Sequence, residues 1–129
     1  SDLRSFEKAV NLARVQSGTV LITITGNNAT AAPCVAKPAG TDLAALPRSD
    51  SCWTSYASAL DKISIAGGAN IRNLVDPWGR PYFLDENESE GGIANCTKDT
   101  LGAYPLPTAA NWTPMAGTEI RVANSVPTC

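Results

Sequence analysis

A run of carboxylates between residues 85 and 90 has the greatest potential for chemistry in this chain. The run reads Asp-Glu-Asn-Glu-Ser-Glu and is followed by two glycines. Oxygen-bearing side chains alternate at Asp85, Asn87 and Ser89, and Ca²⁺ takes about six to eight hard oxygen ligands of this kind. Glu90 stands where a calcium loop of the EF-hand type has glycine, and the run lacks the flanking helices of an EF-hand. The run therefore has two interpretations, a calcium site or a solvated acidic loop.

The residue types in the chain argue against an enzyme. The sequence contains no His, which excludes Ser-His-Asp and Cys-His catalysis. Two carboxylates can serve as the acid and the nucleophile of a glycosidase. Here, however, the carboxylates follow one another on an expected exposed loop, where no apolar surroundings would raise the pKa of one of them. We expect no catalytic residue, no enzymatic activity and no cofactor other than the possible calcium ion.

The composition indicates which classes of partner are not expected and in which kind of compartment the protein is found. The net charge is −2, charged residues make up 17% of the chain, and Lys and Arg form no run. Nucleic acid and anionic membrane surfaces are therefore not expected as partners. The four Cys have no C-x-x-C spacing and no His beside them, which argues against zinc and for two disulfides in an oxidising compartment. The length of 129 residues fits a single domain.

The residues before the acidic run predict the start of a sheet. Asp76-Pro77-Trp78-Gly79 has the residue order of a type I turn. Pro81 can open a strand but cannot lie in mid-sheet. Residues 82–84 then predict a short strand with Tyr82 and Leu84 on one face and Phe83 on the other. Further strands are expected over residues 100–104 and 118–124.

The first 25 residues are expected to form one helix. Apolar or small residues recur with heptad spacing at Leu3, Phe6, Val10, Ala13, Ser17, Val20 and Ile24. Residues 19–25 are rich in β-branched side chains, so the alternative is a helix to Ser17 followed by a strand. We favour the continuous helix because the heptad spacing reaches Ile24 and an interior Gly18 costs only about 1 kcal/mol. Gly26 then suits a left-handed helix cap.

The middle of the chain predicts a loop and a second helix. Residues 28–47 show no clear period, and we expect at most a short helical turn within residues 41–46. Asp50 or Ser51 can cap the following helix, which Gly67 and Gly68 would end. Its apolar stripe comprises Trp53, Tyr56, Leu60 and Ile63. Trp53 and Tyr56 are expected to be core anchors rather than a platform for a ligand.

The thirteen residues from Asp76 to Glu88, following a long helix pattern, resemble the globular domain of bacterial type IV pilins and of type II secretion pseudopilins. The resemblance implies an α+β fold in which a long N-terminal helix packs on a small antiparallel sheet. The single domain would have a spine helix over residues 1–25, a loop and second helix over residues 26–75, and the sheet with the C-terminal region over residues 76–129. The hydrophobic half-helix of that family, with its glutamate, is absent, and we expect roughly 25 to 30 such apolar residues upstream of Ser1.

The function implied by the resemblance is that of a structural subunit of a pilus or pseudopilus filament. Its partners would be other subunits, the assembly or secretion machinery and, before assembly, the inner membrane; the filament would be extracellular or periplasmic. We expect Leu3, Phe6 and Val10 to face neighbouring subunits in part, because a small sheet cannot cover so long a helix. Major pseudopilins bind calcium in a loop of the sheet, which favours a calcium site at Asp85, Asn87 and Ser89. The alternative function is a secreted, disulfide-stapled binding module or adhesin that uses its surface loops.

Four cysteines allow three disulfide pairings. We favour Cys34–Cys52 with Cys96–Cys129, because each bond then staples a segment that has no regular pattern. The nested pairing of Cys34–Cys129 with Cys52–Cys96 is the alternative. Pilins commonly staple a C-terminal segment to the sheet, so the resemblance also implies the Cys96–Cys129 bond.

Overall fold

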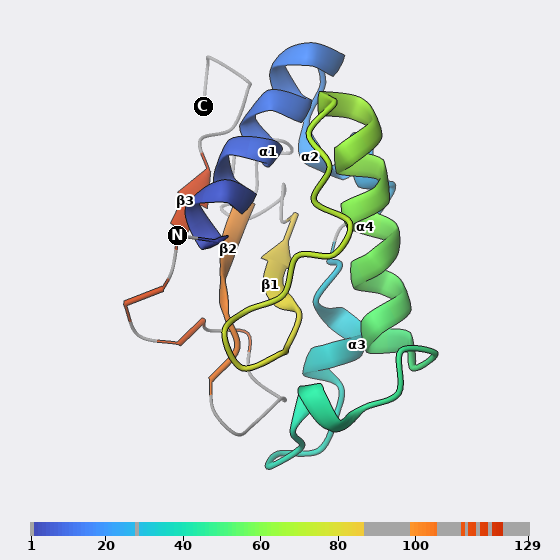
Figure 1. Ribbon diagram of the computed structural model, residues 1–129, viewed down its shortest axis with the longest axis vertical. Helices are drawn as coiled ribbons and strands as arrows, with labels where there is room; N and C mark the ends of the chain where they lie inside the picture. Colours follow the sequence, from blue (N-terminus) through green and yellow to red (C-terminus); the bar gives the residue numbers. More distant parts are fainter. Residues whose placement is uncertain are drawn as a thin grey trace, which may run out of the picture.

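The computed structural model describes residues 2–27, 29–86, 99–105, 112, 114, 115, 117, 118 and 120–122. Its helices are α1 (Asp2–Ser17), α2 (Leu21–Thr25), α3 (Ala32–Val35) and α4 (Ser51–Gly67), with a 3₁₀ turn η1 at Leu43–Ala45. Its strands are β1 (Tyr82–Asp85), β2 (Asp99–Ala103) and β3 (Ile120–Val122), which form an antiparallel sheet in the order β1-β2-β3. The expected α+β class is thus confirmed, with a long N-terminal helix beside a small sheet (Figure 1).

The turn before β1 forms as its residues predict. The backbone N–H of Gly79 donates to the carbonyl of Asp76 at 3.0 Å, and Gly79 has a φ of 77°. The Asp76 side chain secures the turn, since its Oδ1 accepts from the backbone N–H groups of Trp78 at 2.9 Å and of Arg80 at 2.8 Å. Asp76 is buried, and burial raises the pKa of its carboxyl. The turn therefore delivers Pro81 and β1 into the core.

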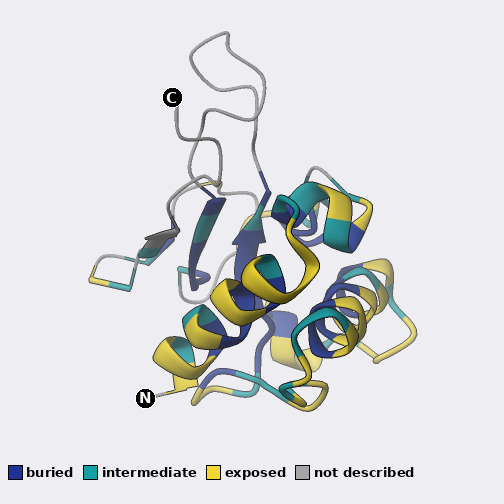
Figure 2. Ribbon diagram, turned by 90° about the horizontal axis from the view of Figure 1, so that it is seen from above, coloured by how far each residue is buried: buried dark blue, intermediate teal, exposed yellow. Residues whose placement is uncertain are grey.

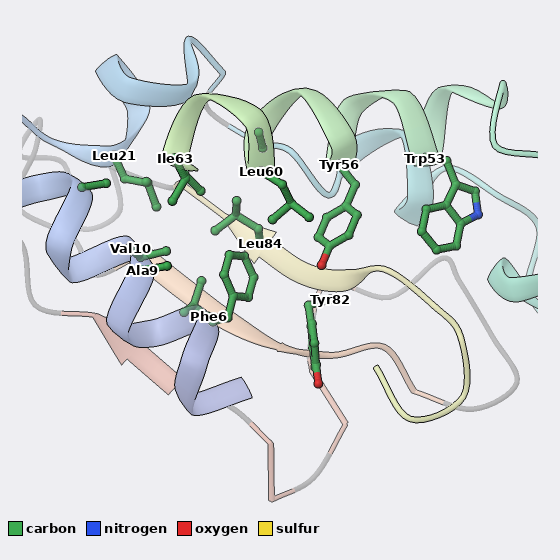
Figure 3. Packing of buried hydrophobic residues seen from close by; sticks show 13 residues of the cluster. Phe6, Ala9, Val10, Leu21, Trp53, Tyr56, Leu60, Ile63, Tyr82 and Leu84 are labelled. Carbon is green, nitrogen blue, oxygen red and sulfur yellow. The ribbon is translucent and has the colours of Figure 1, made fainter. Parts of the chain in front are cut away.

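Both faces of β1 are buried, and its side chains alternate between them as predicted. Tyr82 and Leu84 lie in the main core between α1 and α4 (Figure 3). Phe83 points to the other side, where its ring packs edge-on against that of Tyr104, with the ring centroids 5.5 Å apart. The fully buried Leu84 lies opposite Leu101 of β2. Burying one such side chain contributes about 1.5–3 kcal/mol to the free energy of unfolding. Because its side chains point to both sides, the short β1 contributes to two hydrophobic clusters.

The helix α4 has the caps and the core face that were predicted. Asp50 is its N-cap and accepts the backbone N–H of Cys52 at 2.9 Å, while Gly68 takes the left-handed C-cap conformation. Trp53 and Tyr56 are 4% and 2% exposed, which confirms them as core anchors. Their polar atoms are satisfied as well: Trp53 Nε1–H donates to the Leu43 carbonyl at 2.9 Å, and the Tyr56 hydroxyl donates to the Leu74 carbonyl at 2.8 Å.

The prediction of one helix over residues 1–25 is wrong. The helix α1 ends at Ser17, and Gly18 turns the chain with a φ of +69° while its N–H donates to the Arg14 carbonyl at 2.9 Å. The strand alternative is wrong too, because Leu21–Thr25 form the short helix α2. A glycine that reaches the left-handed region freely is a common helix stop. Here it lets Leu21 and Thr25 turn back and become buried; the expected cap at Gly26 is confirmed.

The segment 28–47 contains more structure than predicted. The helix α3 was not expected, whereas η1 lies within the short helical turn expected over residues 41–46. A disulfide joins Cys34 of α3 to Cys52 of α4, as predicted. Cys96 and Cys129 lie outside the described residues, so their pairing stays a prediction. Among the described helices, none combines the length and the apolarity needed to cross a lipid bilayer.

Candidate functional site

The inner face of α1 belongs to the core, which corrects one expectation. Phe6 and Val10 are 0% exposed, and Leu3 is only partly exposed. The expected exposure of Phe6 and Val10 is therefore wrong. Its premise was that the sheet alone covers α1, but α4 packs along α1 as well (Figure 3). The two helices approach so closely that a Cβ on Gly67 would lie 2.8 Å from the backbone N of Ala13.

The outer face of α1 is mainly polar but carries two apolar side chains. Val15 is 78% exposed and Leu12 is 38% exposed, while buried residues line the opposite side of the helix (Figure 2). Near its start, Arg4 and Glu7 form an exposed ion pair at 2.9 Å. Such a pair contributes about 0–1 kcal/mol. The apolar residues near the C-terminal end of α1 are therefore its most notable surface feature.

Of the three predicted calcium ligands, the described residues include only Asp85, the last residue of β1, which is partly buried. Asn87 and Ser89 lie outside the described residues. In the part of the chain that the structure describes, no three His, Cys, Asp or Glu side chains are grouped as a metal site. The calcium site therefore stays a prediction.

Sequence reasoning missed the most organised polar cluster, which surrounds Glu86. This carboxyl is 0% exposed, so the expectation that the acidic run lies on an exposed loop is wrong at Glu86. Its Oε1 accepts the backbone N–H of Thr30 at 2.8 Å, and its Oε2 lies 2.7 Å from the Thr30 hydroxyl and 2.5 Å from the Thr25 hydroxyl. A signal was available, because Glu86 continues the alternation of Tyr82 and Leu84 onto the core side of the sheet.

The cluster favours a protonated Glu86 below about pH 7. Burial raises the pKa of this carboxyl from 4.5 to about 7, although the bonds from Thr25 and Thr30 oppose that rise. The Thr25 oxygen also lies 3.2 Å from each of two backbone carbonyls, those of Leu21 and Asn27. A hydroxyl has one proton, so Thr25 can donate to only one of these three acceptors. A protonated Glu86 resolves the conflict by donating to Thr25, which then donates to a carbonyl.

The cluster connects segments that are distant in the sequence. It joins the residue after β1 to α2 and to Thr30, two residues before α3. The Lys62 Nζ of α4 also donates to the Thr25 carbonyl at 3.1 Å. A small polar hollow lies alongside, lined by Thr25, Gly26, Asn27, Thr30, Ser55, Ser58, Ala59 and Lys62. The donors and acceptors around Glu86 are used within the fold, which gives the cluster a structural role.

Two further grooves lie on the surface. The first, of about 530 Å³, lies at the N-terminal end of α1 and is lined by Asp2, Leu3, Pro77, Trp78, Tyr82, Ala103, Met115, Gly117 and Thr118. The second, of about 440 Å³, lies between α4 and residues 72–75. There the guanidinium of Arg48 stacks on the Trp53 ring, with its Cζ atom 3.4 Å from the ring centroid. The first groove is predominantly apolar, whereas the second combines an apolar floor with two arginines, Arg48 and Arg72.

Comparisons with known proteins give no relative from which a function can be transferred. No family model matches the chain, and no curated protein and no solved structure is significantly similar to it.

Proposed function

We propose that this chain is the globular domain of a filament subunit of the type IV pilin or pseudopilin kind, and that α1 is the element through which it assembles. The observation that carries the proposal is the division of α1 into two faces. Its inner face fills the core, while its outer face exposes Val15 and Leu12. Single exposed apolar side chains are common, but these lie on the N-terminal helix, which is the assembly element of the family that the sequence resembles.

The order of elements supports the same proposal. An N-terminal helix lies beside an antiparallel sheet, a second helix intervenes, and the Asp76–Gly79 turn leads into the first strand. The helix α1 begins at an exposed residue at the edge of the molecule (Figure 1). The assembly face we propose comprises Leu12 and Val15 and replaces Phe6 and Val10, which are fully buried.

The partners and location follow from the proposed function. The subunit would contact copies of itself or related subunits and the machinery that assembles them, and a membrane anchor would hold it before assembly. The Cys34–Cys52 disulfide supports an oxidising compartment. If Ca²⁺ binds Asp85 together with Asn87 and Ser89, excess chelator should lower the melting temperature, since a ligand that binds only the folded state stabilises it. Identical melting curves would favour the solvated acidic loop.

The test is to introduce a charged residue on the outer face of α1 in the full-length protein, expressed in its native host cell. Val15→Asp should leave the domain folded and reduce the number of surface filaments at least about tenfold. An unpaired carboxylate in a subunit interface costs more than the roughly 1.4 kcal/mol that corresponds to this factor. The readouts are electron microscopy of filaments and the melting temperature of the domain.

The matched control is Ile65→Asp, which adds the same charge at an exposed apolar residue of α4. Ile65 is 68% exposed, close to the 78% of Val15. Filaments should persist in this control. Normal filament numbers in both Val15→Asp and Leu12→Asp would contradict assembly through the outer face of α1.

The Arg48 groove favours a second candidate function, that of a secreted binding module. Arg72 is paired with Asp61 at 2.7 Å, whereas Arg48 has no ion pair with a described residue. Stacked on Trp53, its guanidinium is held ready for a carboxylate. The test is an NMR titration with an oligosaccharide of uronic acid units. Shifts confined to the groove and lost in Arg48→Gln would support this function, and an unchanged spectrum would reject it.

A further inference from the structure

A surface groove lies at one end of α1 and a surface patch at the other, and both are partly apolar. The N-end groove is the apolar groove at the helix start, with Leu3, Trp78, Tyr82 and Met115 in its lining and Asp2 at the helix terminus. The C-end patch comprises Asn11, Arg14, Val15 and Gly18, which share a surface hollow near the end of the same helix. Trp78 is 50% exposed and Val15 is 78% exposed, so each surface presents a large apolar side chain to solvent.

The charges at the two surfaces are opposite. Asp2 is exposed in the N-end groove and makes no ion pair with a described residue. It lies near enough to Tyr82 to help burial raise the pKa of that phenol. Arg14 in the C-end patch also has no ion pair in the described part of the chain, and its buried Nε lacks a hydrogen-bond partner there. Each surface therefore offers a charge that the other can neutralise.

The two surfaces cannot meet within one molecule. Leu3 and Val15 are separated by twelve residues of α1, about 18 Å along the helix axis. A contact between them must therefore join two copies of the chain. Because the contacting surfaces are different, the interface is heterologous, and a heterologous contact that does not close into a ring produces an open helical filament.

We propose that the C-end patch of one copy docks into the N-end groove of the next. This inference rests on the proposed filament function and names the contact between successive subunits. Val15 packs between Leu3 and Trp78 of the neighbouring copy, and Arg14 pairs with that copy's Asp2. Trp and Arg are the residue types most often found at the energetic centre of an interface. The ion pair fixes the direction in which the subunits join.

The test is covalent trapping in filaments of the full-length protein. One chain carries both Val15→Cys and Trp78→Cys, and the filaments are treated with a short bismaleimide linker. The expected product is a ladder of covalent dimers, trimers and higher oligomers, because every subunit is linked at both ends. Filaments assembled from a mixture of the two single variants should stop at a dimer that joins Cys at position 15 to Cys at position 78.

Matched controls separate this contact from random collisions. Ile65→Cys with Trp78→Cys places an equally exposed thiol on α4 and should give no ladder, and neither should the unsubstituted protein. Links between two copies of position 15, or between two copies of position 78, would show a symmetric interface and overturn the proposal. Filaments without any ladder would also overturn it and leave the filament function standing. Failure of the unsubstituted full-length protein to form filaments would reject the filament function, and this contact with it.

A charge exchange gives an independent readout on the same filaments. In the cysteine-bearing chain, Asp2→Arg alone and Arg14→Asp alone should each reduce the yield of the ladder about tenfold. The two substitutions together should restore it, because the pair is re-formed with its charges exchanged. A double variant no better than the single variants would contradict the Asp2–Arg14 pairing.

Discussion

The two faces of α1 differ sharply in burial, and the proposed function assigns each face a different purpose. Phe6 and Val10 on the inner face are fully buried between the sheet and α4, whereas Val15 on the outer face is 78% exposed. A side chain with no exposed surface, such as that of Phe6 or Val10, is not available for contact with a neighbour. In the proposed filament, this division would separate the residues that stabilise the fold from those that contact neighbouring subunits. Substitutions on the two faces should therefore affect different measurements.

The largest effect is expected from truncating the inner face. Phe6→Ala should lower the free energy of unfolding by about 3–5 kcal/mol, because it removes a fully buried ring and leaves a cavity. Phe6 also packs edge-on against Tyr56 at 6.5 Å. Urea denaturation of the isolated domain measures the change. A loss below about 1 kcal/mol would mean that Phe6 does not occupy the core.

The next effect concerns pH and the buried Glu86. Below about pH 4.5 its carboxyl is protonated in the folded and unfolded states alike. Between there and about pH 7 only the folded state keeps the proton, so stability should fall as the pH rises, by about 3 kcal/mol in all. Glu86→Gln mimics the protonated form and should remove this pH dependence and be more stable than the unsubstituted protein at pH 8.

Urea denaturation between pH 4.5 and pH 8 measures this difference. The control is Glu7→Gln, which changes a carboxylate in the exposed pair with Arg4. It should retain the pH dependence attributed to Glu86. An equal free energy of unfolding at pH 5 and pH 8 in both the unsubstituted protein and Glu86→Gln would contradict the assignment.

A smaller effect should follow from adding a methyl group where α1 meets α4. Gly67→Ala places a Cβ 2.8 Å from the Ala13 backbone, which overpacks the contact and should cost about 1–3 kcal/mol. The comparison is Gly18→Ala, whose Cβ would meet nothing within 4 Å but whose φ is +69°. That variant should lose about 1 kcal/mol from backbone strain alone. A stabilised Gly67→Ala in thermal unfolding would show that the two helices are less closely packed.

The smallest effect on stability is expected on the outer face. Val15→Ala should change the free energy of unfolding by less than about 0.5 kcal/mol, because the side chain is mostly in solvent already. Measured alongside Phe6→Ala by urea denaturation, it sharpens the contrast between the two faces. A loss comparable to that of Phe6→Ala would place Val15 in a buried contact within the domain.

The sequence predicts the elements whose signals are local. The turn from Asp76 to Gly79, the strand that follows and the caps of α4 all depend on nearby residues, and each forms as predicted. The second strand lies within one residue of its predicted position, whereas the third begins at Ile120, two residues after its predicted start.

The failures arise where distant residues decide the outcome. The heptad spacing of apolar residues predicts that α1 continues through Gly18. That spacing contains no information about the left-handed turn that Gly18 makes. Thr25 turns inward because Glu86, 61 residues away, lies within hydrogen-bonding distance. The burial of Phe6 likewise depends on contact between α1 and α4. The residues near Phe6 in the sequence do not predict this contact. Thr30 and Glu86 are another such pair, 56 residues apart.

The most direct test of the central claim is the accessibility of position 15 in assembled filaments. Val15→Cys and, as a reference, Ile65→Cys are labelled with a soluble maleimide in the free domain and in filaments of the full-length protein. Both thiols should react readily in the free domain, since both native side chains are largely exposed. In filaments, position 15 should be protected while position 65 continues to react. Equal labelling of the two positions in filaments would contradict assembly through the outer face of α1.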